Sequence, residues 1–337
     1  MQEIKIGVVG YGYWGPNIVR NFFGTSQCTV RMVADGRPER LKALARIFPT
    51  IEGVKDAEDI IGSSEIDAVV IATPVFTHYE LAKRALLAGK HVLIEKPMTS
   101  SVREADELIN LAAQKGLTLM ADHTFLYTGA VQKMKEIIDG DVIGKPLYFD
   151  SARINLGLFQ PDINVLWDLA PHDISILTYL IAEDPESINA TGISHTQNQI
   201  ENIAYLTVNY NSSLIAHFTC SWSSPVKVRQ TLIGGDKKMI LYNDLEPSEK
   251  VRVYDTGYNH KTEEDKTRIM VDYRTGDVYI PKLSSREALA GVAEDFVQSV
   301  IQKKAPLSNA ILGRRVVKIL EASQESIKNK GKEIRIK

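Results

Sequence analysis

Cysteine is scarce in this sequence, and the two residues of this type, Cys28 and Cys220, lie far apart. A disulfide framework needs several cysteines, and a structural zinc site needs ligands at close spacing. Neither kind of site is expected, and no other metal site is predicted. Both cysteines are interpreted as buried thiols that pack like small apolar side chains.

Long apolar runs are also absent. The chain has no stretch of about 18 consecutive apolar residues, the length that a membrane-spanning helix needs. Residues 1–7 lack the basic start and the long apolar centre of a signal peptide. We therefore expect a cytoplasmic protein with no membrane partner.

An excess of charge of one sign is missing as well. The formal net charge is -2, and the hydrophobic share of 44% and charged share of 24% are ordinary for a globular protein. Such a balance gives no general attraction to nucleic acid or to anionic lipid. Repeats and low-complexity tracts are absent too. A length of 337 residues indicates two domains, and small-molecule partners must be inferred from local sites.

Short apolar runs alternate with amphipathic runs through the first third of the chain. The expected strands are 4–9, 29–34, 66–72, 91–94 and 117–121, and the expected helices are 16–23, 38–47, 79–88 and 102–114. This alternation implies right-handed crossovers and a parallel sheet covered on both faces. We predict an α/β dinucleotide-binding domain over residues 1–122.

The pattern changes after residue 122. Helices are expected over 130–138, 171–181, 286–303 and 313–328, and strands over 146–154, 188–195, 203–210, 214–222, 226–233 and 238–242. Consecutive strands joined by short turns indicate a large, open, mainly antiparallel sheet. Residues 123–337 are predicted to form an α+β domain, in which the charged segment 256–275 is an exposed loop or a solvated hairpin.

A glycine-rich turn follows the first expected strand. Gly10, Gly12 and Gly15 have the spacing G-x-G-x-x-G, and a helix is expected directly after them. Glycine permits the tight turn, the approach of a pyrophosphate to the backbone, and close packing of the helix on the sheet. The helix N-terminus then faces the phosphate charge. The motif predicts dinucleotide binding, with a purely structural turn as the alternative.

Asp35 stands 20 residues after Gly15, at the end of the second expected strand. Its carboxylate would accept hydrogen bonds from the adenosine ribose and repel a 2′-phosphate, which favours NAD. Arg37 and Arg40 follow closely, and arginine here can accept the phosphate, so NADP stays possible. Tyr13 and Trp14 are candidates to cover the cofactor or to pack in the fold.

Further cofactor candidates follow the third expected strand. Thr73 and Pro74 occupy the carboxyl end of a parallel strand, the usual ligand edge of this architecture. Their backbone can line the nicotinamide ribose, or they form an ordinary turn. His78 is either a cofactor residue or a structural residue at the start of a helix.

Lys96 leaves the same edge one strand later, between Glu95 and Pro97. A proline restricts the residue before it to extended conformations, so Lys96 cannot continue a helix. In a dry site its ammonium group would stabilise alkoxide character on a substrate oxygen. A solvated loop lysine is the alternative. Glu95 joins the cofactor candidates at this edge.

Asp168 and His172 are four residues apart, so on a helix they share one face. Histidine is a natural acceptor of the proton of a sugar hydroxyl as hydride leaves the same carbon. The structural alternative makes Asp168 an N-cap with Pro171 in the first turn, and makes His172 a partly buried helix residue. The two interpretations are compatible, because a ligand can approach a helix start.

Polar residues near these elements are candidate substrate contacts. They are Tyr127, Arg153, Asn155 and Gln160. Ordinary surface polarity explains them nearly as well.

Taken together, these motifs resemble the Gfo/Idh/MocA family of NAD(P)-dependent oxidoreductases. The resemblance rests on Gly10-x-Gly-x-x-Gly15, Ala72-Thr-Pro74, Glu95-Lys-Pro97 and Asp168-x-x-x-His172, and it extends over essentially the whole chain. Residues 10–16 and 167–173 are further similar to members that act on nucleotide-activated sugars. Ala170 departs from the pattern, because many members have glycine there.

The resemblance implies a catalytic Lys96, acid–base or orienting roles for His172 and Asp168, and a homodimer or homotetramer formed through the C-terminal sheet. The expected reaction moves a hydride between NAD(H) and a ring secondary hydroxyl, perhaps at C3, of a nucleotide-linked hexose. A free polyol such as an inositol is the alternative substrate. A sensor or scaffold that binds NAD without turnover is the alternative of another class. We expect Lys96 and His172 to converge on one cleft.

Overall fold

The computed structural model describes residues 3–157, 159–160, 162–259 and 272–336. The chain forms two compact units. The first comprises Met1–Thr128 and Arg286–Glu321, and the second comprises Gly129–Ser285 and Ala322–Lys337.

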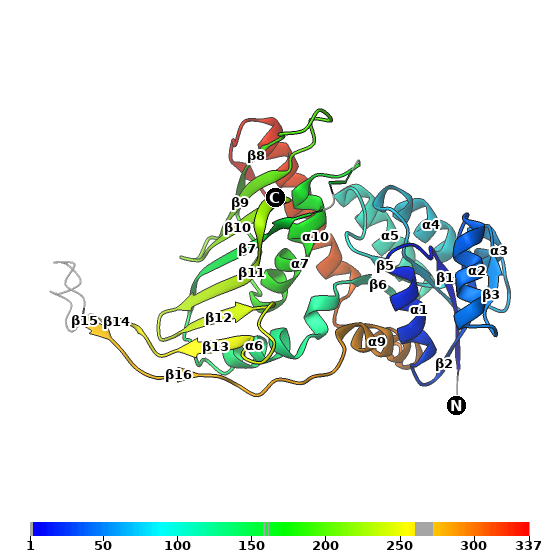
Figure 1. The fold of residues 1–337 in the computed structure, drawn as a ribbon, viewed down its shortest axis with the longest axis horizontal. Coiled ribbons are helices and arrows are strands. Elements are labelled where there is room, and N and C mark those ends of the chain that lie inside the picture. The colour runs from blue at the N-terminus through cyan, green and yellow to red at the C-terminus, as the bar shows by residue number, and fades with distance from the viewer. Residues whose placement is uncertain (1–2, 158, 161, 260–271, 337) are drawn as a thin grey trace. The chain divides into compact units, whose positions relative to one another are not determined.

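A six-stranded parallel sheet with the order β3-β2-β1-β4-β5-β6 forms the centre of the first unit (Figure 1). The strands are β1 (Ile4–Val9), β2 (Cys28–Ala34), β3 (Glu52–Val54), β4 (Ala68–Ile71), β5 (His91–Glu95) and β6 (Leu119–Asp122). The order reverses between β1 and β4, and ligands of such sheets bind beside this switch point. The predicted α/β architecture is confirmed. The short edge strand β3 was not predicted because three residues give no periodic signal.

Helices connect these strands. They are α1 (Gly15–Phe23), α2 (Pro38–Ile47), α3 (Ala57–Ile61), α4 (Val75–Leu87) and α5 (Val102–Lys115), and α4 and α5 lie side by side (Figure 1). Local chemistry fixes the ends of α5. The Ser101 hydroxyl accepts a hydrogen bond from the Glu104 amide at 3.3 Å, and Gly116 ends the helix at a positive φ of 66°.

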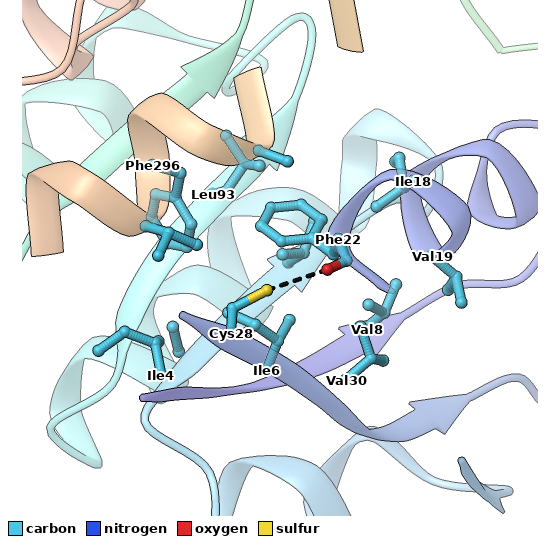
Figure 2. Close-up of a cluster of buried hydrophobic side chains, with 14 of the residues drawn as sticks. Ile4, Ile6, Val8, Ile18, Val19, Phe22, Cys28, Val30, Leu93 and Phe296 are labelled. Atoms are coloured by element: carbon cyan, nitrogen blue, oxygen red, sulfur yellow. Dashed lines mark hydrogen bonds between the residues drawn. The ribbon is translucent and has the colours of Figure 1, made fainter. Parts of the chain in front are cut away.

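The first unit also contains a segment from near the C-terminus. Helix α9 (Ala288–Gln302) packs against α1 and against the short 3₁₀ helix η1 (Thr124–Tyr127). Phe296 from α9 meets Phe22 edge to face, with ring centroids 6.2 Å apart (Figure 2). Residues 286–321 were placed in the second domain by sequence, because amphipathic helices do not show which sheet they cover.

Both cysteines are buried thiols, as predicted. Figure 2 shows the Cys28 thiol donating a hydrogen bond to the Phe22 carbonyl oxygen, at 3.0 Å, within the apolar cluster. Burial raises the pKa of Cys28 to about 12, so its thiol stays protonated at neutral pH. Among the described residues, no group of His, Cys, Asp and Glu is arranged to hold a metal ion.

A nine-stranded sheet forms the second unit, with the order β16-β13-β12-β11-β7-β10-β9-β8-β17. The strands are β7 (Pro146–Leu156), β8 (Ser187–Ile193), β9 (Ile203–Asn209), β10 (Ile215–Ser221), β11 (Ser223–Gly235), β12 (Met239–Asn243), β13 (Val251–Tyr254), β16 (Val278–Tyr279) and β17 (Ile334–Arg335). β7 and β10 pair in parallel, and the other pairs in this sheet are antiparallel. The predicted mainly antiparallel sheet is confirmed.

A small separate pair of strands lies in the charged segment that was predicted as a loop or hairpin. β14 (Gly257–Asn259) and β15 (Asp272–Arg274) pair antiparallel, and residues 260–271 between them lie outside the described residues. The other helices of the described residues are α6 (Gly129–Asp139), α7 (Val165–Leu180) and α10 (Ala310–Lys328). No helix formed by the described residues is long and apolar enough to span a membrane.

Helix α7 lies against β7, β9 and β10. The sequence predicted that it starts at Pro171, but it starts at Val165. Asn164 is its N-cap, and the side-chain oxygen accepts hydrogen bonds from the amides of Leu166 and Trp167 at 3.1 and 3.2 Å. Pro171 lies inside the helix and is buried, so packing outweighs the cost of an interior proline. Asp168 is therefore a first-turn residue and not the N-cap.

Candidate active site

The glycine turn of the first unit has the shape that a dinucleotide requires. Gly10 has a φ of +101°, and a Cβ atom there would lie 2.6 Å from the Ala72 carbonyl oxygen. A Cβ atom on Gly15 would lie 2.4 Å from the Gly10 carbonyl oxygen, so α1 sits close to β1. Trp14, the N-cap of α1, provides no side-chain cap for the helix. The helix start and the bare backbone of Gly12 therefore fit a pyrophosphate.

Asp35 follows β2, and 7% of its surface is exposed. Its carboxylate accepts hydrogen bonds from the backbone amides of Tyr11, at 2.9 Å, and Arg37, at 3.0 Å. The Arg37 guanidinium donates two more, both at 2.9 Å. Burial raises the pKa of Asp35, but these hydrogen bonds and the charge of Arg37 outweigh it and lower the pKa to about 2. Asp35 is thus ionised at neutral pH.

His78 is fully buried in α4 and connects two loops at the carboxyl edge of the sheet. Its Nδ1 lies 3.0 Å from the Pro97 carbonyl oxygen, and its Nε2 lies 2.8 Å from the Thr73 carbonyl oxygen. Burial, with a smaller effect of the Lys96 charge, lowers its pKa even though the carbonyl contacts raise it. A neutral ring donates to one of the two carbonyls. The imidazole thus lies between the segments after β4 and β5 and donates a hydrogen bond to one of them.

Lys96 directly follows β5, at the same edge, and the Lys96–Pro97 peptide bond is cis. The Lys96 amide donates a hydrogen bond to the Glu95 carboxylate at 3.0 Å. Glu95 is paired in register with Asp122 at the end of β6. The positive charge of Lys96 acts on both carboxyl groups and on His123.

Burial shifts the pKa values of these three neighbours of Lys96 away from their usual ranges. Burial and the charge of Asp122 raise the pKa of Glu95 to about 8, and burial raises that of Asp122 to about 6. Burial and the Lys96 charge lower the pKa of His123 to about 3, so its ring is neutral. Two adjacent carboxyl groups on neighbouring strands cannot both ionise easily, and one of them retains a proton near neutral pH.

The sequence did not single out Asp122 and His123. Asp122 ends β6 as Glu95 ends β5, and His123 follows β6 as Lys96 follows β5; this position is the signal that points to them. Tyr13 and Trp14 are candidates to cover the cofactor or to pack in the fold. Both are exposed in the glycine turn, with ring centroids 5.5 Å apart in an edge-to-face arrangement.

Asp168 and His172 lie one turn apart on α7, as their spacing predicted. The indole Nε1 of Trp222 donates a hydrogen bond to the Asp168 carboxylate at 2.9 Å. Trp222 is 1% exposed and packs against Phe159, with ring centroids 5.6 Å apart. Sequence reasoning missed this tryptophan, because 54 residues separate it from Asp168 and no local pattern links them.

Arg153 was predicted as a substrate contact. The structure instead places it in the interior, where it donates two hydrogen bonds to Asp173 at 2.8 and 2.7 Å. Burial lowers the pKa of Arg153, but the charge of Asp173 outweighs it and the pKa lies above its usual range. The pair joins β7 to α7, next to His172.

The other predicted substrate contacts differ in their surroundings. The Tyr127 hydroxyl donates to Asp295 at 2.7 Å and accepts from the Ser308 amide at 3.2 Å, both within the first unit. Asn155 is half-buried near the end of β7, and Gln160 is half-buried in the loop before α7. Lys96 belongs to the first unit and His172 to the second, and their convergence on one substrate stays a prediction.

A parallel sheet with a glycine turn after its first strand and an acidic residue after β2 is typical of the class of dinucleotide-binding proteins. Residues 4–123 match the family model described as an oxidoreductase family with an NAD-binding Rossmann fold. Residues 131–241 match the model of the GFO/IDH/MocA C-terminal domain. The chain belongs to the Gfo/Idh/MocA family of oxidoreductases, and its first unit is an NAD-binding domain.

Individual relatives are similar along their whole length. UDP-N-acetylglucosamine 3-dehydrogenase of Acidithiobacillus ferrooxidans is 26% identical over 94% of this chain and 95% of its own. Its solved structure has a TM-score of 0.80 over 98% of this chain and 99% of its own, at 24% identity. The scyllo-inositol 2-dehydrogenase (NADP(+)) IolW of Bacillus subtilis is 24% identical over 98% of this chain and 95% of its own.

A solved structure with a bound cofactor has the same fold. GenD2 from gentamicin A biosynthesis, in complex with NAD, has a TM-score of 0.83 at 18% identity, over 100% of this chain and 97% of its own. At this identity the likeness concerns the fold alone.

Proposed function

We propose that this protein is an NAD-dependent dehydrogenase or ketoreductase that acts on a ring secondary hydroxyl of a nucleotide-linked hexose, with C3 as the reacting carbon. The observation that carries the proposal is the end-to-end likeness to UDP-N-acetylglucosamine 3-dehydrogenase. The Glu95-Lys-Pro97 and Asp168-x-x-x-His172 motifs, in the elements where this chemistry needs them, support it.

Three residues share the proposed chemistry. NAD, when bound, accepts the hydride. His172 accepts the proton of the substrate hydroxyl, and Lys96 stabilises the negative charge that develops on that oxygen. Asp168, held by Trp222, orients the reacting groups. Because His123 is neutral, it adds no second positive charge beside Lys96.

Beyond this chemistry, the predicted residues are proposed to act in three ways. Cofactor contacts are assigned to Gly10, Gly12, Tyr13, Trp14, Gly15, Asp35, Thr73, Pro74, Glu95 and Lys96, and substrate contacts to Asn155 and Gln160. For His78, Tyr127 and Arg153 the hydrogen bonds above favour a supporting role, because their polar atoms are bonded within the fold.

The uncovered face of the nine-stranded sheet is proposed to form a homodimer or homotetramer. Tyr148 on β7 and Ile215 on β10 are paired in register, and Tyr205 on β9, which pairs with Thr219 on β10, lies further along the same face. Tyr205 and Ile215 are each 48% exposed. Apolar residues exposed together on one face of a sheet are typical of an interface. A cytoplasmic location stays a prediction.

A substrate panel tests the proposal. UDP-N-acetylglucosamine and other UDP-hexoses are offered beside scyllo- and myo-inositol, with NAD or NADP, and NAD(P)H is followed by fluorescence. Turnover of a UDP-hexose supports the proposal. Turnover of inositols alone overturns it in favour of the polyol alternative, which the likeness to IolW favours. Binding of NADH without turnover of any sugar favours the sensor alternative.

Replacing Lys96 by Ala is expected to lower kcat at least about 100-fold, because a positioned charge at the reacting oxygen has an effect of that order. The Kd of NADH, measured by fluorescence titration, is expected to change little. Lys115→Ala is the control, because this exposed lysine ends α5 and donates to the Leu87 carbonyl at 3.1 Å, at the amino edge of the sheet. An unchanged kcat for Lys96→Ala would overturn the catalytic assignment.

A further inference from the structure

The face of the nine-stranded sheet that carries α7 also carries a second arginine. Arg229 on β11 is the register partner of Arg153 on β7. Residues directly opposite each other in an antiparallel pair lie on the same face of the sheet. Arg153 binds Asp173, which directly follows His172. Arg229 therefore lies one strand spacing, about 5 Å, from the arginine that holds the His172 turn.

Arg153 is committed to the fold, whereas Arg229 is partly open to solvent. Arg153 is buried, and Asp173 balances its charge. The side chain of Arg229 is 32% exposed, and its Nη1 lies 3.4 Å from Oδ2 of Asp244. Helix α7 packs on β7, β9 and β10, so Arg229 lies beside the helix rather than beneath it. A ligand that contacts the His172 turn can therefore reach Arg229.

The guanidinium of Arg229 has a donor that the described chain does not use. Asp244 accepts from Nη1, but Nε is buried without a hydrogen-bond partner among the described residues. A buried donor without an acceptor is unfavourable, and native structures contain few of them. The Nε–Nη2 edge of a guanidinium can bind a carboxylate or a phosphate through two parallel hydrogen bonds. This edge of Arg229 is suited to an oxyanion from outside the chain.

A lysine adds to the positive charge beside Arg229. Lys250 Nζ donates to the main-chain carbonyl oxygen of Asp244 and lies 3.4 Å from its Oδ1. The Tyr242 hydroxyl donates to the same Oδ1 at 3.1 Å. Asp244 balances one of the two cations, so this group of four side chains keeps one positive charge in excess. It therefore attracts an anion.

We propose that Arg229, with Lys250 beside it, binds the diphosphate of a nucleotide-linked sugar. The inference rests on the proposed function, because a free polyol carries no diphosphate. In a nucleotide-linked hexose the diphosphate is attached at C1, two ring carbons from C3. A cation about one strand spacing from the arginine that holds the His172 turn suits that separation. Arg229 is thus the residue that favours nucleotide-linked sugars over inositols.

The test compares ligands with and without the diphosphate on the full-length protein. Replacing Arg229 by Ala is expected to raise the Kd of UDP, measured by calorimetry with NADH present, at least about tenfold, the effect of a charge-assisted hydrogen bond. The Kd of uridine, which has no phosphate, should stay the same. The KM of UDP-N-acetylglucosamine should rise similarly while kcat changes little, because the contact is remote from the reacting carbon. Arg229→Lys should fall between, since it keeps the charge and loses the fork.

Arg274→Ala is the matched control. Arg274 on β15 is 33% exposed and also pairs with an aspartate, Asp255, at 3.1 Å, but it belongs to the separate two-stranded sheet. Its replacement is expected to leave both Kd values unchanged. An unchanged Kd of UDP in Arg229→Ala would overturn the inference. Equal weakening of UDP and uridine would overturn it too, because the substitution would then act through the fold.

Failure of the inference and failure of the proposed function give different results. Turnover of UDP-N-acetylglucosamine by wild type, with the same KM in Arg229→Ala, overturns the inference alone. Turnover of inositols by a wild type that binds no UDP overturns both. UDP binding that depends on Arg229, without turnover of any UDP-hexose, supports the inference and overturns the proposed reaction.

Discussion

At the scale of single residues, Asp168 depends on a tryptophan from another element. The Trp222 indole is buried and donates to the Asp168 carboxylate at 2.9 Å. A donor inside the fold fixes the direction of the carboxylate, because a hydrogen bond weakens steeply as it bends. The orientation of the proposed catalytic carboxylate is therefore set by β10 and its following turn as well as by α7.

Replacing Trp222 by Phe is expected to lower kcat at least about tenfold, since a hydrogen bond to a charged group contributes on the order of 1.5–3 kcal/mol. The KM of the sugar should change much less, because the ring shape is kept. Steady-state kinetics measure both. Trp167→Phe, at the half-buried neighbour of Asp168, is the control for loss of an indole. Equal kinetics for the Trp222 variant and wild type would contradict the positioning role.

At the scale of elements, α7 is held on its sheet by a buried ion pair. The Arg153 and Asp173 side chains are 3% and 4% exposed, and they join β7 to the turn that carries His172. A buried charge without its partner is costly, whereas an apolar replacement of both partners is often tolerated. The pair therefore sets the position of the helix more than it adds net stability.

Arg153→Met is expected to reduce the free energy of unfolding by about 3–5 kcal/mol, because Asp173 is left buried and unpaired by this partner. The double variant Arg153→Met with Asp173→Leu should recover most of that loss. Urea denaturation of the four proteins in this cycle measures the coupling. As a control, Lys135→Met breaks the exposed pair with Asp139 on α6 and should cost less than about 1 kcal/mol. A single variant as stable as wild type would contradict the prediction.

At the scale of the whole molecule, the uncovered sheet face leads to a prediction about assembly. Ile215→Lys puts a charge beside Tyr148 on this face and should shift the protein from the proposed dimer or tetramer toward monomer, because burying an unpaired charge is costly. Light scattering coupled to size-exclusion chromatography measures the mass. Ile47→Lys, on exposed α2 of the first unit, should leave the mass unchanged. A wild-type monomer, or an Ile215 variant with wild-type mass, would contradict the prediction.

The sequence by itself determined the features that short stretches encode. The glycine turn, Asp35 after β2, Lys96 after β5 and the spacing of Asp168 and His172 are all local, and so are most strands of both sheets. Local patterns are sufficient here because a strand end, a tight turn and a helical face each depend on a few neighbouring residues.

Only the tertiary structure decided which distant groups meet. It places α9 in the first unit and pairs β7 with β10 in parallel. It also gives Arg153, Tyr127 and His78 polar contacts within the fold. It also showed that the Arg37 guanidinium donates hydrogen bonds to the Asp35 carboxylate. The two residues are close in sequence, but the sequence does not predict this contact, because a side-chain rotamer depends on the surface around it. Long-range packing and hydrogen bonding leave no periodic signal, so no local pattern in the chain could report them.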